Sequence, residues 1–213
     1  MTYQNFKNIA YAWPIVFSKD LVAAKKDAQV IRNQLQRWQN KGLLVRLRRG
    51  VFLLNERDRK INPSRLYIAN QLYSPSYISM EYALSYYGLI PERTNDLTSI
   101  TTKKTFHITN PTGTFVYQHI KPNAFRGFRV LKDEAGLSFF IAEPEKAVVD
   151  FLYLNLGKFN AADENVFEGS YRLQNTEILN LKKIVLYAKL FNNDKLEGIA
   201  NALCKFISKE KAK

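Results

Sequence analysis

The chain has 213 residues and a formal net charge of +13 at pH 7, which predicts an anionic partner, with nucleic acid ahead of a membrane surface. A hydrophobic content of 46% is typical of folded globular proteins and excludes a wholly disordered chain. Because it has no apolar run long enough for a membrane span, no secretory leader and a single cysteine, Cys204, we expect a soluble cytoplasmic protein without an intramolecular disulfide.

Three helices are predicted at the start of the chain. Residues 3–12 form a short helix or a lead-in segment that ends before Trp13-Pro14. Ser18 caps a second short helix, and Asp27 caps a longer one that ends at Gly42. In the longer helix the apolar residues follow i, i+4, i+7 spacing, which places them on one buried face: Ile31, Leu35 and Trp38.

The opposite face of the longer helix is polar and basic. Amide side chains pair well with adenine and guanidinium groups with guanine, so this face suits the major groove of DNA. The N-terminal half of a recognition helix enters the groove most deeply. We therefore predict that the helix contacts DNA through Gln29, Arg32, Asn33, Gln36 and Arg37, with Asn40 ranked lower.

After Gly42 the pattern changes to that of a β-hairpin. Residues 43–48 alternate, Arg49-Gly50 turns the chain, and residues 51–54 return it. The hairpin carries Arg46, Arg48 and Arg49 at or near its tip, where cations contact the DNA backbone or the minor groove. Two helices followed by this hairpin predict a winged helix-turn-helix over residues 1–58.

The distribution of charge supports DNA binding by this region. Residues 1–60 hold 13 Lys and Arg against 4 Asp and Glu, whereas the remaining 153 residues hold 19 against 15. Phosphate neutralisation would use such an excess. An alternative stays open, because winged-helix domains also serve as protein-docking modules and exposed arginines are often only solvated.

Residues 59–213 are predicted to form a second, mixed domain, so the chain as a whole is α+β. The boundary lies in the polar segment 55–63. Helices follow at 64–73 and 79–87, started by Ser64 and Ser79. Five short strands come next, and three helices end the chain. The strands span 98–102, 105–109, 114–120, 127–131 and 137–142, and the helices span 144–155, 175–190 and 194–209.

No catalytic, metal or cofactor site is predicted. His107 and His119 lie in predicted strands without metal-ligand neighbours, so we interpret them as surface or packed residues. A third hypothesis, a nucleic-acid-modifying enzyme, would need a clustered metal or acid–base site that the sequence does not offer. The expectation is therefore a protein that is not an enzyme, with Cys204 as a buried, inert thiol.

Acidic residues around the helix 144–155 have structural interpretations. Glu143 and Glu145 lie where negative side chains favour a helix N-terminus. Asp150 lies four residues after Lys146, a spacing that an ordinary ion pair explains.

Several segments resemble the AbiEi antitoxin family of bacterial abortive-infection systems. They are SYISMEYALSYYGLIPE (76–92), residues 101–128, IAEPEKAVVDFLY (141–153) and the hairpin LVRLRRGVF (44–52). The ALSYYGLIP and EPEKAVVD blocks, in this order behind a winged helix, are fairly specific, whereas no motif is recognised in the last 50 residues.

The resemblance implies a transcriptional autorepressor and antitoxin of a type IV toxin–antitoxin system. Its N-terminal domain would bind operator repeats in double-stranded DNA near its own promoter. Its C-terminal domain would counter a nucleotidyltransferase-like toxin without a required stable complex. By the same analogy, a second basic surface would add DNA contacts through Lys103, Lys104, Arg126 and Arg129.

Overall fold

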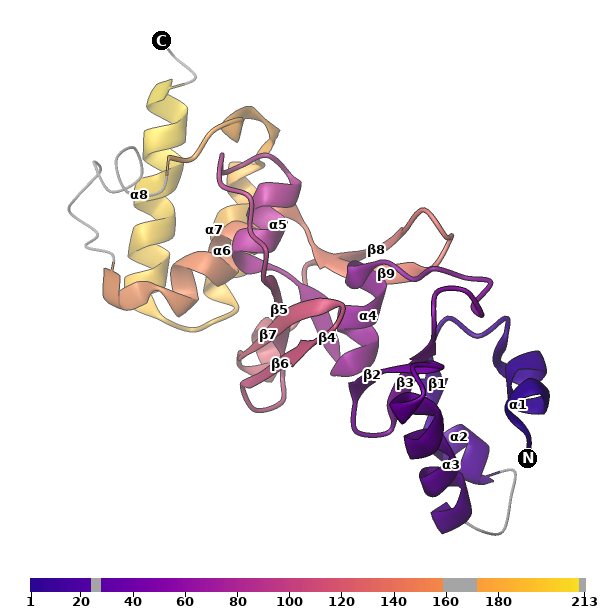
Figure 1. Cartoon of the computed structure of the whole chain (residues 1–213). Helices are drawn as coiled ribbons and strands as arrows, with labels where there is room; N and C mark the ends of the chain where they lie inside the picture. Colours follow the sequence, from indigo (N-terminus) through magenta and orange to yellow (C-terminus); the bar gives the residue numbers. More distant parts are fainter. Residues whose placement is uncertain (24–27, 159–171, 211–213) are drawn as a thin grey trace.

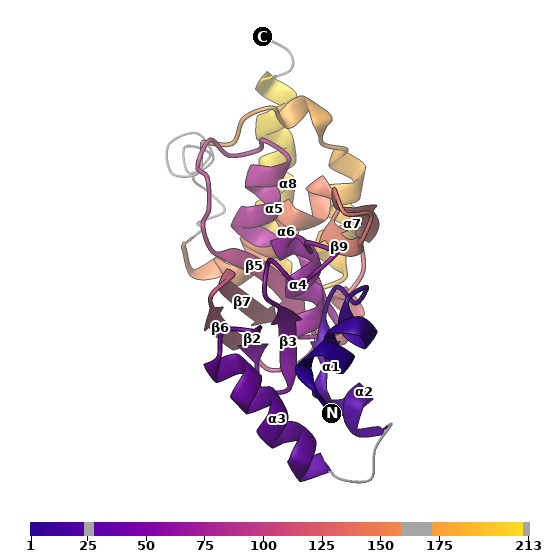
Figure 2. The same ribbon diagram turned by 45° about the vertical axis from the view of Figure 1, so that its right-hand side comes forward.

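Two β-sheets organise the chain into an elongated α+β structure. The computed structural model describes residues 1–23, 28–158 and 172–210. The N-terminal helices lie at one end and the C-terminal helices at the other, with the larger sheet between them (Figures 1 and 2). The predicted α+β class is thus confirmed. Within the described residues, no helix is both long and apolar enough to cross a membrane.

The N-terminal sheet has three antiparallel strands in the order β1-β3-β2. Strand β1 was not predicted, because two residues are too few for a periodic pattern. The predicted cap Asp27 lies outside the described residues, and α2 begins at Ser18 itself. The elements are α1 (Tyr3–Ala10), β1 (Val16–Phe17), α2 (Ser18–Ala23), α3 (Ala28–Asn40), β2 (Leu44–Arg48) and β3 (Val51–Leu54).

The β2–β3 hairpin contributes to two hydrophobic cores. Successive residues of a strand point to opposite faces, so the hairpin has two apolar sides. One side, with Leu44, Phe52 and Leu54, joins the small core beneath α1 and α3. The other side joins the main core of the larger sheet through Leu47, Val51 and Leu53. The hairpin is therefore fixed against both parts of the molecule.

Gly50 closes the hairpin with a backbone conformation that favours glycine. Its φ is +77°, and a Cβ at this position would lie 2.8 Å from Ser18 Oγ. The Ser18 amide also donates to the Gly50 carbonyl at 2.8 Å. The turn is therefore held against the start of α2.

We expect Gly50→Ala to lower the free energy of unfolding by about 2–4 kcal/mol, combining left-handed strain with the Ser18 overlap. The matched control is Gly136→Ala, since Gly136 has the same φ of +77° and a Cβ added there would meet nothing within 4 Å. Strain alone predicts about 1–2 kcal/mol for the control. Urea denaturation measures both, and equal losses would show that the Ser18 contact contributes nothing.

The larger sheet has six strands in the order β6-β7-β5-β4-β9-β8, with parallel pairs at β5–β7 and β4–β9. The short central strand β4 was not predicted. Helix α4 packs on β4, β5 and β9, and α5 packs on α6. The elements are α4 (Arg65–Leu72), β4 (Ser76–Ile78), α5 (Met80–Tyr86), β5 (Leu97–Thr101), β6 (Phe106–Asn110), β7 (Gly113–His119), β8 (Phe128–Lys132) and β9 (Ser138–Ala142).

The C-terminal helices α6 (Pro144–Leu154), α7 (Leu181–Lys189) and α8 (Asp194–Glu210) pack together beyond the sheet. The continuous helix predicted over 175–190 is wrong. A 3₁₀ turn spans Thr176–Ile178, and α7 starts only after Asn180, whose side chain accepts from the Lys182 and Lys183 amides. Asn180 thus caps a new helix, as asparagine often does.

The two serines predicted to cap helices behave differently. Ser64 caps α4, since its side chain accepts from the Tyr67 amide at 3.2 Å. Ser79 precedes α5 but makes no side-chain cap bond; its hydroxyl instead donates to Asp150.

Candidate nucleic-acid interface

The polar face of α3 is exposed, as its periodicity predicted. Its apolar face lies in the small core, where Trp38 stacks on Phe6 with ring centroids 4.7 Å apart. The exposed residues include the five predicted DNA contacts: Gln29, Arg32, Asn33, Gln36 and Arg37. Packing of one face therefore orients the other outward.

The amide side chains of α3 are ordered by contacts within the helix. Gln29 Nε2 donates to Asn33 Oδ1 at 3.0 Å, and Gln36 Nε2 donates to Asn40 Oδ1 at 2.9 Å. Both pairs have the i, i+4 spacing of neighbours on a helix surface. Gln29 Oε1 also accepts from Arg32 Nη1 at 3.5 Å, so Gln29 contacts both of the neighbouring candidate residues.

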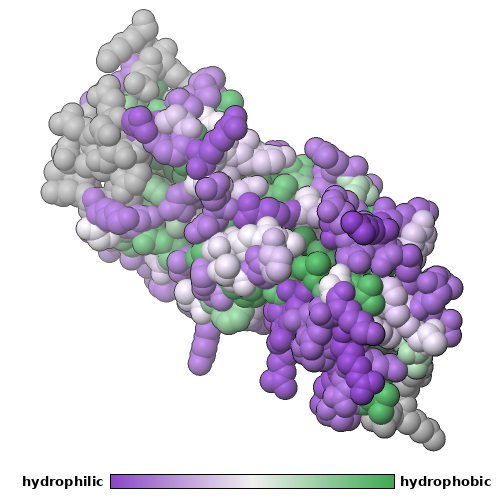
Figure 3. All heavy atoms as spheres, viewed as in Figure 1, coloured by the Kyte–Doolittle hydropathy of each residue, from purple (hydrophilic) through white to green (hydrophobic). Residues whose placement is uncertain are grey.

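A cleft of about 240 Å³ lies between α3 and the β2–β3 hairpin. It brings two residues of the helix, Arg32 and Gln36, together with Arg46 and Arg49 of the hairpin. We call it the arginine cleft; its lining residues are Ser18, Arg32, Leu35, Gln36, Arg46, Arg49, Gly50 and Phe52, none of them acidic. Figure 3 shows mostly hydrophilic side chains over this end of the molecule.

Two larger grooves, each of about 640 Å³, adjoin the hairpin. One lies along the contact between β2 and β6, and it is lined by all three predicted wing arginines together with His107 and Asn110. The other lies between the hairpin on one side and the end of α4 and the β5–β6 loop on the other, and we call it the intersheet groove. Its lining residues are Phe17, Ser18, Lys19, Asp20, Arg48, Arg49, Gly50, Val51, Gln71, Tyr73, Ser74 and Lys103.

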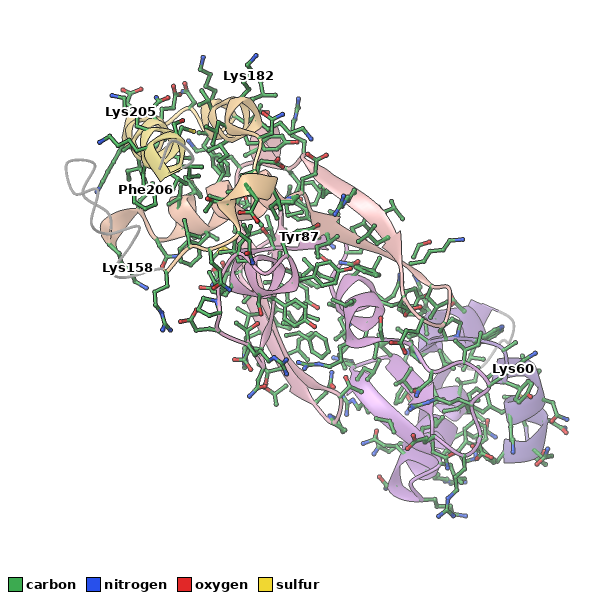
Figure 4. The ribbon with its side chains drawn as sticks, turned by 90° about the horizontal axis from the view of Figure 1, so that it is seen from above. Lys60, Tyr87, Lys158, Lys182, Lys205 and Phe206 are labelled. Carbon is green, nitrogen blue, oxygen red and sulfur yellow. The ribbon has the colours of Figure 1, made fainter. Side chains whose placement is uncertain are left out.

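The four residues of the predicted second basic surface lie in two separate places. Lys103 lines the intersheet groove, and Lys104 follows it in the β5–β6 loop. Arg129 lies on β8, three strands away from β5, where it stacks on Tyr87 at 5.3 Å from the ring centroid. Arg126 precedes β8 and is exposed. Figure 4 places Tyr87 well away from the N-terminal end, where Lys60 is labelled.

The acids around α6 have structural partners. Glu143 precedes the helix, and its carboxylate accepts from Lys183 Nζ at 2.6 Å and from Tyr187 at 2.8 Å. The Lys183 hydrogen bond holds the pKa of Glu143 below its usual value. Glu145 accepts from the Asn180 amide at 2.9 Å. These contacts join α6 to the start of α7.

Sequence reasoning missed a buried polar network around Asp150. The predicted ion pair with Lys146 is present, but both side chains are fully buried. Asp150 Oδ2 also accepts from Tyr77 at 2.9 Å and from Ser79 at 2.8 Å. The network thus joins the segment 76–92 to the segment 141–153. Spacing within one helix could not indicate partners more than 70 residues away.

The other candidate chemical groups form no cluster. His107 and His119 are both exposed, and no group of three His, Cys, Asp or Glu residues suited to a metal occurs in the described part of the chain. Cys204 is only partly buried, not fully as expected. Its thiol contacts the Leu181 carbonyl at 3.6 Å, and burial raises the thiol pKa, which disfavours the reactive thiolate.

Comparison with models of protein families gives no match for this chain, and comparison with curated proteins gives none either.

Proposed function

We propose that the protein binds duplex DNA sequence-specifically through a winged helix-turn-helix in residues 1–58. In this proposal α3 enters the major groove and the β2–β3 hairpin is the wing. The arginine cleft carries the proposal, because it unites base-reading side chains of α3 with hairpin arginines and contains no opposing carboxylate. Residues 24–27, which connect α2 to α3 in the sequence, lie outside the described residues.

The two elements would divide the work of recognition. Amides on α3 would pair with base edges, so Asn33 and Gln29 would set sequence preference. The hairpin arginines would contact phosphates or the minor groove, which adds affinity for any sequence and makes it depend on salt.

The resemblance to AbiEi antitoxins extends the proposal to a biological role. The protein would repress transcription at its own promoter, and residues 59–213 would counter a nucleotidyltransferase-like toxin. The exposed cations around the hairpin support the DNA-binding part of this role. The antitoxin part rests on the resemblance alone.

Fluorescence anisotropy across a salt series tests the proposal directly. The two probes are the duplex upstream of the protein's own gene and a scrambled duplex of equal length and composition. We expect tighter binding to the native sequence, with affinity that falls steeply as salt rises. Equally weak binding to both probes would contradict the proposal and would favour the protein-docking alternative.

Asn33→Ala is expected to reduce the preference for the native duplex about tenfold, because one bidentate amide–base contact is worth about 1–3 kcal/mol of discrimination. Binding to the scrambled duplex should change little. The matched control is Asn8→Ala on α1, since Asn8 is also exposed and accepts from Gln4 Nε2 at 3.1 Å, like Asn33 from Gln29 at 3.0 Å. If both changes altered the preference for the native duplex equally, Asn33 would have no role in base recognition.

A further inference from the structure

The intersheet groove has the composition of an anion site. Four cationic side chains line it, against the single carboxylate of Asp20. The cations come from three separate parts of the fold: Lys19 from α2, Arg48 and Arg49 from the hairpin, and Lys103 from the β5–β6 loop. Ser18, Gln71 and Ser74 add neutral hydrogen-bond donors to the lining. Such a mixture of cations, hydroxyls and amides is typical of contacts to phosphate and sugar.

The β5–β6 loop that carries Lys103 is held in place by contacts to its backbone carbonyl groups. Tyr73 donates to the Lys104 carbonyl at 3.1 Å, and His119 Nδ1 lies 3.0 Å from the Lys103 carbonyl. The Lys103 ammonium lies over the Tyr73 ring, 5.4 Å from its centroid, and donates to the Ser74 carbonyl at 2.5 Å. An ammonium has three donors, so two stay available for an anion. The lysine is therefore presented from a fixed loop.

The two sides of the groove are also fixed relative to each other. One face of the hairpin belongs to the main core through Leu47, Val51 and Leu53. In addition, Asn110 Nδ2 at the end of β6 donates to the Leu47 carbonyl at 3.1 Å. The separation between the hairpin arginines and Lys103 is thus set by the fold, and no rearrangement is needed to bring the cations together.

We propose that the intersheet groove holds the sugar–phosphate backbone of the DNA that flanks the segment contacted by α3. The DNA footprint then extends past the winged helix onto the β5–β6 loop, and residues 59–213 contribute directly to affinity through Lys103. This inference rests on the proposed function. It assigns no phosphate contact to Arg126 or Arg129, which lie elsewhere on the molecule.

Length and salt dependence of binding test this assignment. The full chain and its Lys103→Ala variant are titrated with random-sequence duplexes of two lengths, differing by about one helical turn of roughly 10 base pairs. On the longer duplex we expect Lys103→Ala to bind about threefold to tenfold more weakly. Its log–log salt slope should fall by about 0.9, the contribution of one phosphate contact. On the shorter duplex the two proteins should bind alike.

Two controls separate a contact from a change in net charge. Lys103→Arg retains the cation and should bind like the natural chain. Lys182→Ala removes one exposed lysine from α7, at the far end of the molecule (Figure 4), and should leave the slope unchanged. If Lys103→Ala and Lys182→Ala show the same affinity and salt slope while the natural chain binds DNA, the groove assignment is wrong but the proposed function stands. If the natural chain binds no duplex, the proposed function itself is wrong, and the groove assignment falls with it.

Discussion

Asp150→Asn is expected to lower the free energy of unfolding by about 3–5 kcal/mol, because it leaves the fully buried Lys146 ammonium without a counter-charge. The substitution keeps the shape of the side chain. Tyr77 and Ser79 both donate to Oδ2, so an amide oxygen there would still accept from them. The amide nitrogen would then face Lys146 Nζ, and two donors would oppose each other.

A double-substitution cycle measures the interaction energy between Lys146 and Asp150 apart from their contacts with other residues. Lys146→Met alone leaves the Asp150 carboxylate unpaired and should cost a similar amount. Lys146→Met with Asp150→Asn removes both charges, so we expect it to recover most of the stability, since a buried pair gains little over neutral groups of similar volume. Chemical denaturation measures all four proteins. Losses that simply add would show that the two side chains do not interact energetically.

The two single variants should differ in their response to pH. Burial lowers the pKa of Lys146 and raises that of Asp150, and in the natural protein their mutual attraction opposes both shifts. In Asp150→Asn the folded-state pKa of Lys146 falls further below its unfolded value. The free energy of unfolding that this variant loses, relative to the natural protein, should therefore become smaller as pH rises from about 7 to 9. In Lys146→Met the pKa of Asp150 rises further. The free energy of unfolding that this variant loses should therefore become larger as pH rises from about 4 to 7.

The exposure of the candidate DNA-contacting residues was predictable because it depends on local periodicity. In α3, burial of Ile31, Leu35 and Trp38 is enough to expose the opposite face, whatever the rest of the chain does. The hairpin likewise follows from alternation and from a turn that needs Gly50. Helix α3 and the two hairpin strands were therefore placed within a few residues of their observed bounds.

Features that depend on distant contacts were not predictable. Strand β4 has three residues and owes its place to pairing with β5 and β9. Lys103 looked like one member of a diffuse basic surface, and only the tertiary fold places it in the same groove as Arg48 and Arg49. Nothing in the sequence near Ser79 indicates that its hydroxyl donates to Asp150 and makes no cap hydrogen bond to α5.

Arg48→Ala combined with Arg49→Ala is expected to weaken binding to every duplex by about 10- to 100-fold at moderate salt. Each arginine lines the intersheet groove, and Arg49 also lines the arginine cleft. Losing two phosphate contacts should reduce the log–log salt slope by about 1.8. The ratio of affinities for native and scrambled duplexes should hardly change, because backbone contacts carry no sequence information. Anisotropy titrations at several salt concentrations measure both quantities.

The charge-matched comparison is Lys182→Ala with Lys189→Ala, which removes two positive charges from exposed positions on α7, away from the hairpin. Long-range attraction between the whole protein and DNA would weaken equally in both double variants, and at about 0.15 M salt it is screened over roughly 8 Å. Direct contact would affect only the hairpin variant. If both variants lost affinity to the same extent, the arginines would matter only through net charge, and the hairpin could not be the wing of a DNA-binding domain. A large difference confined to the hairpin would locate the DNA backbone at its tip.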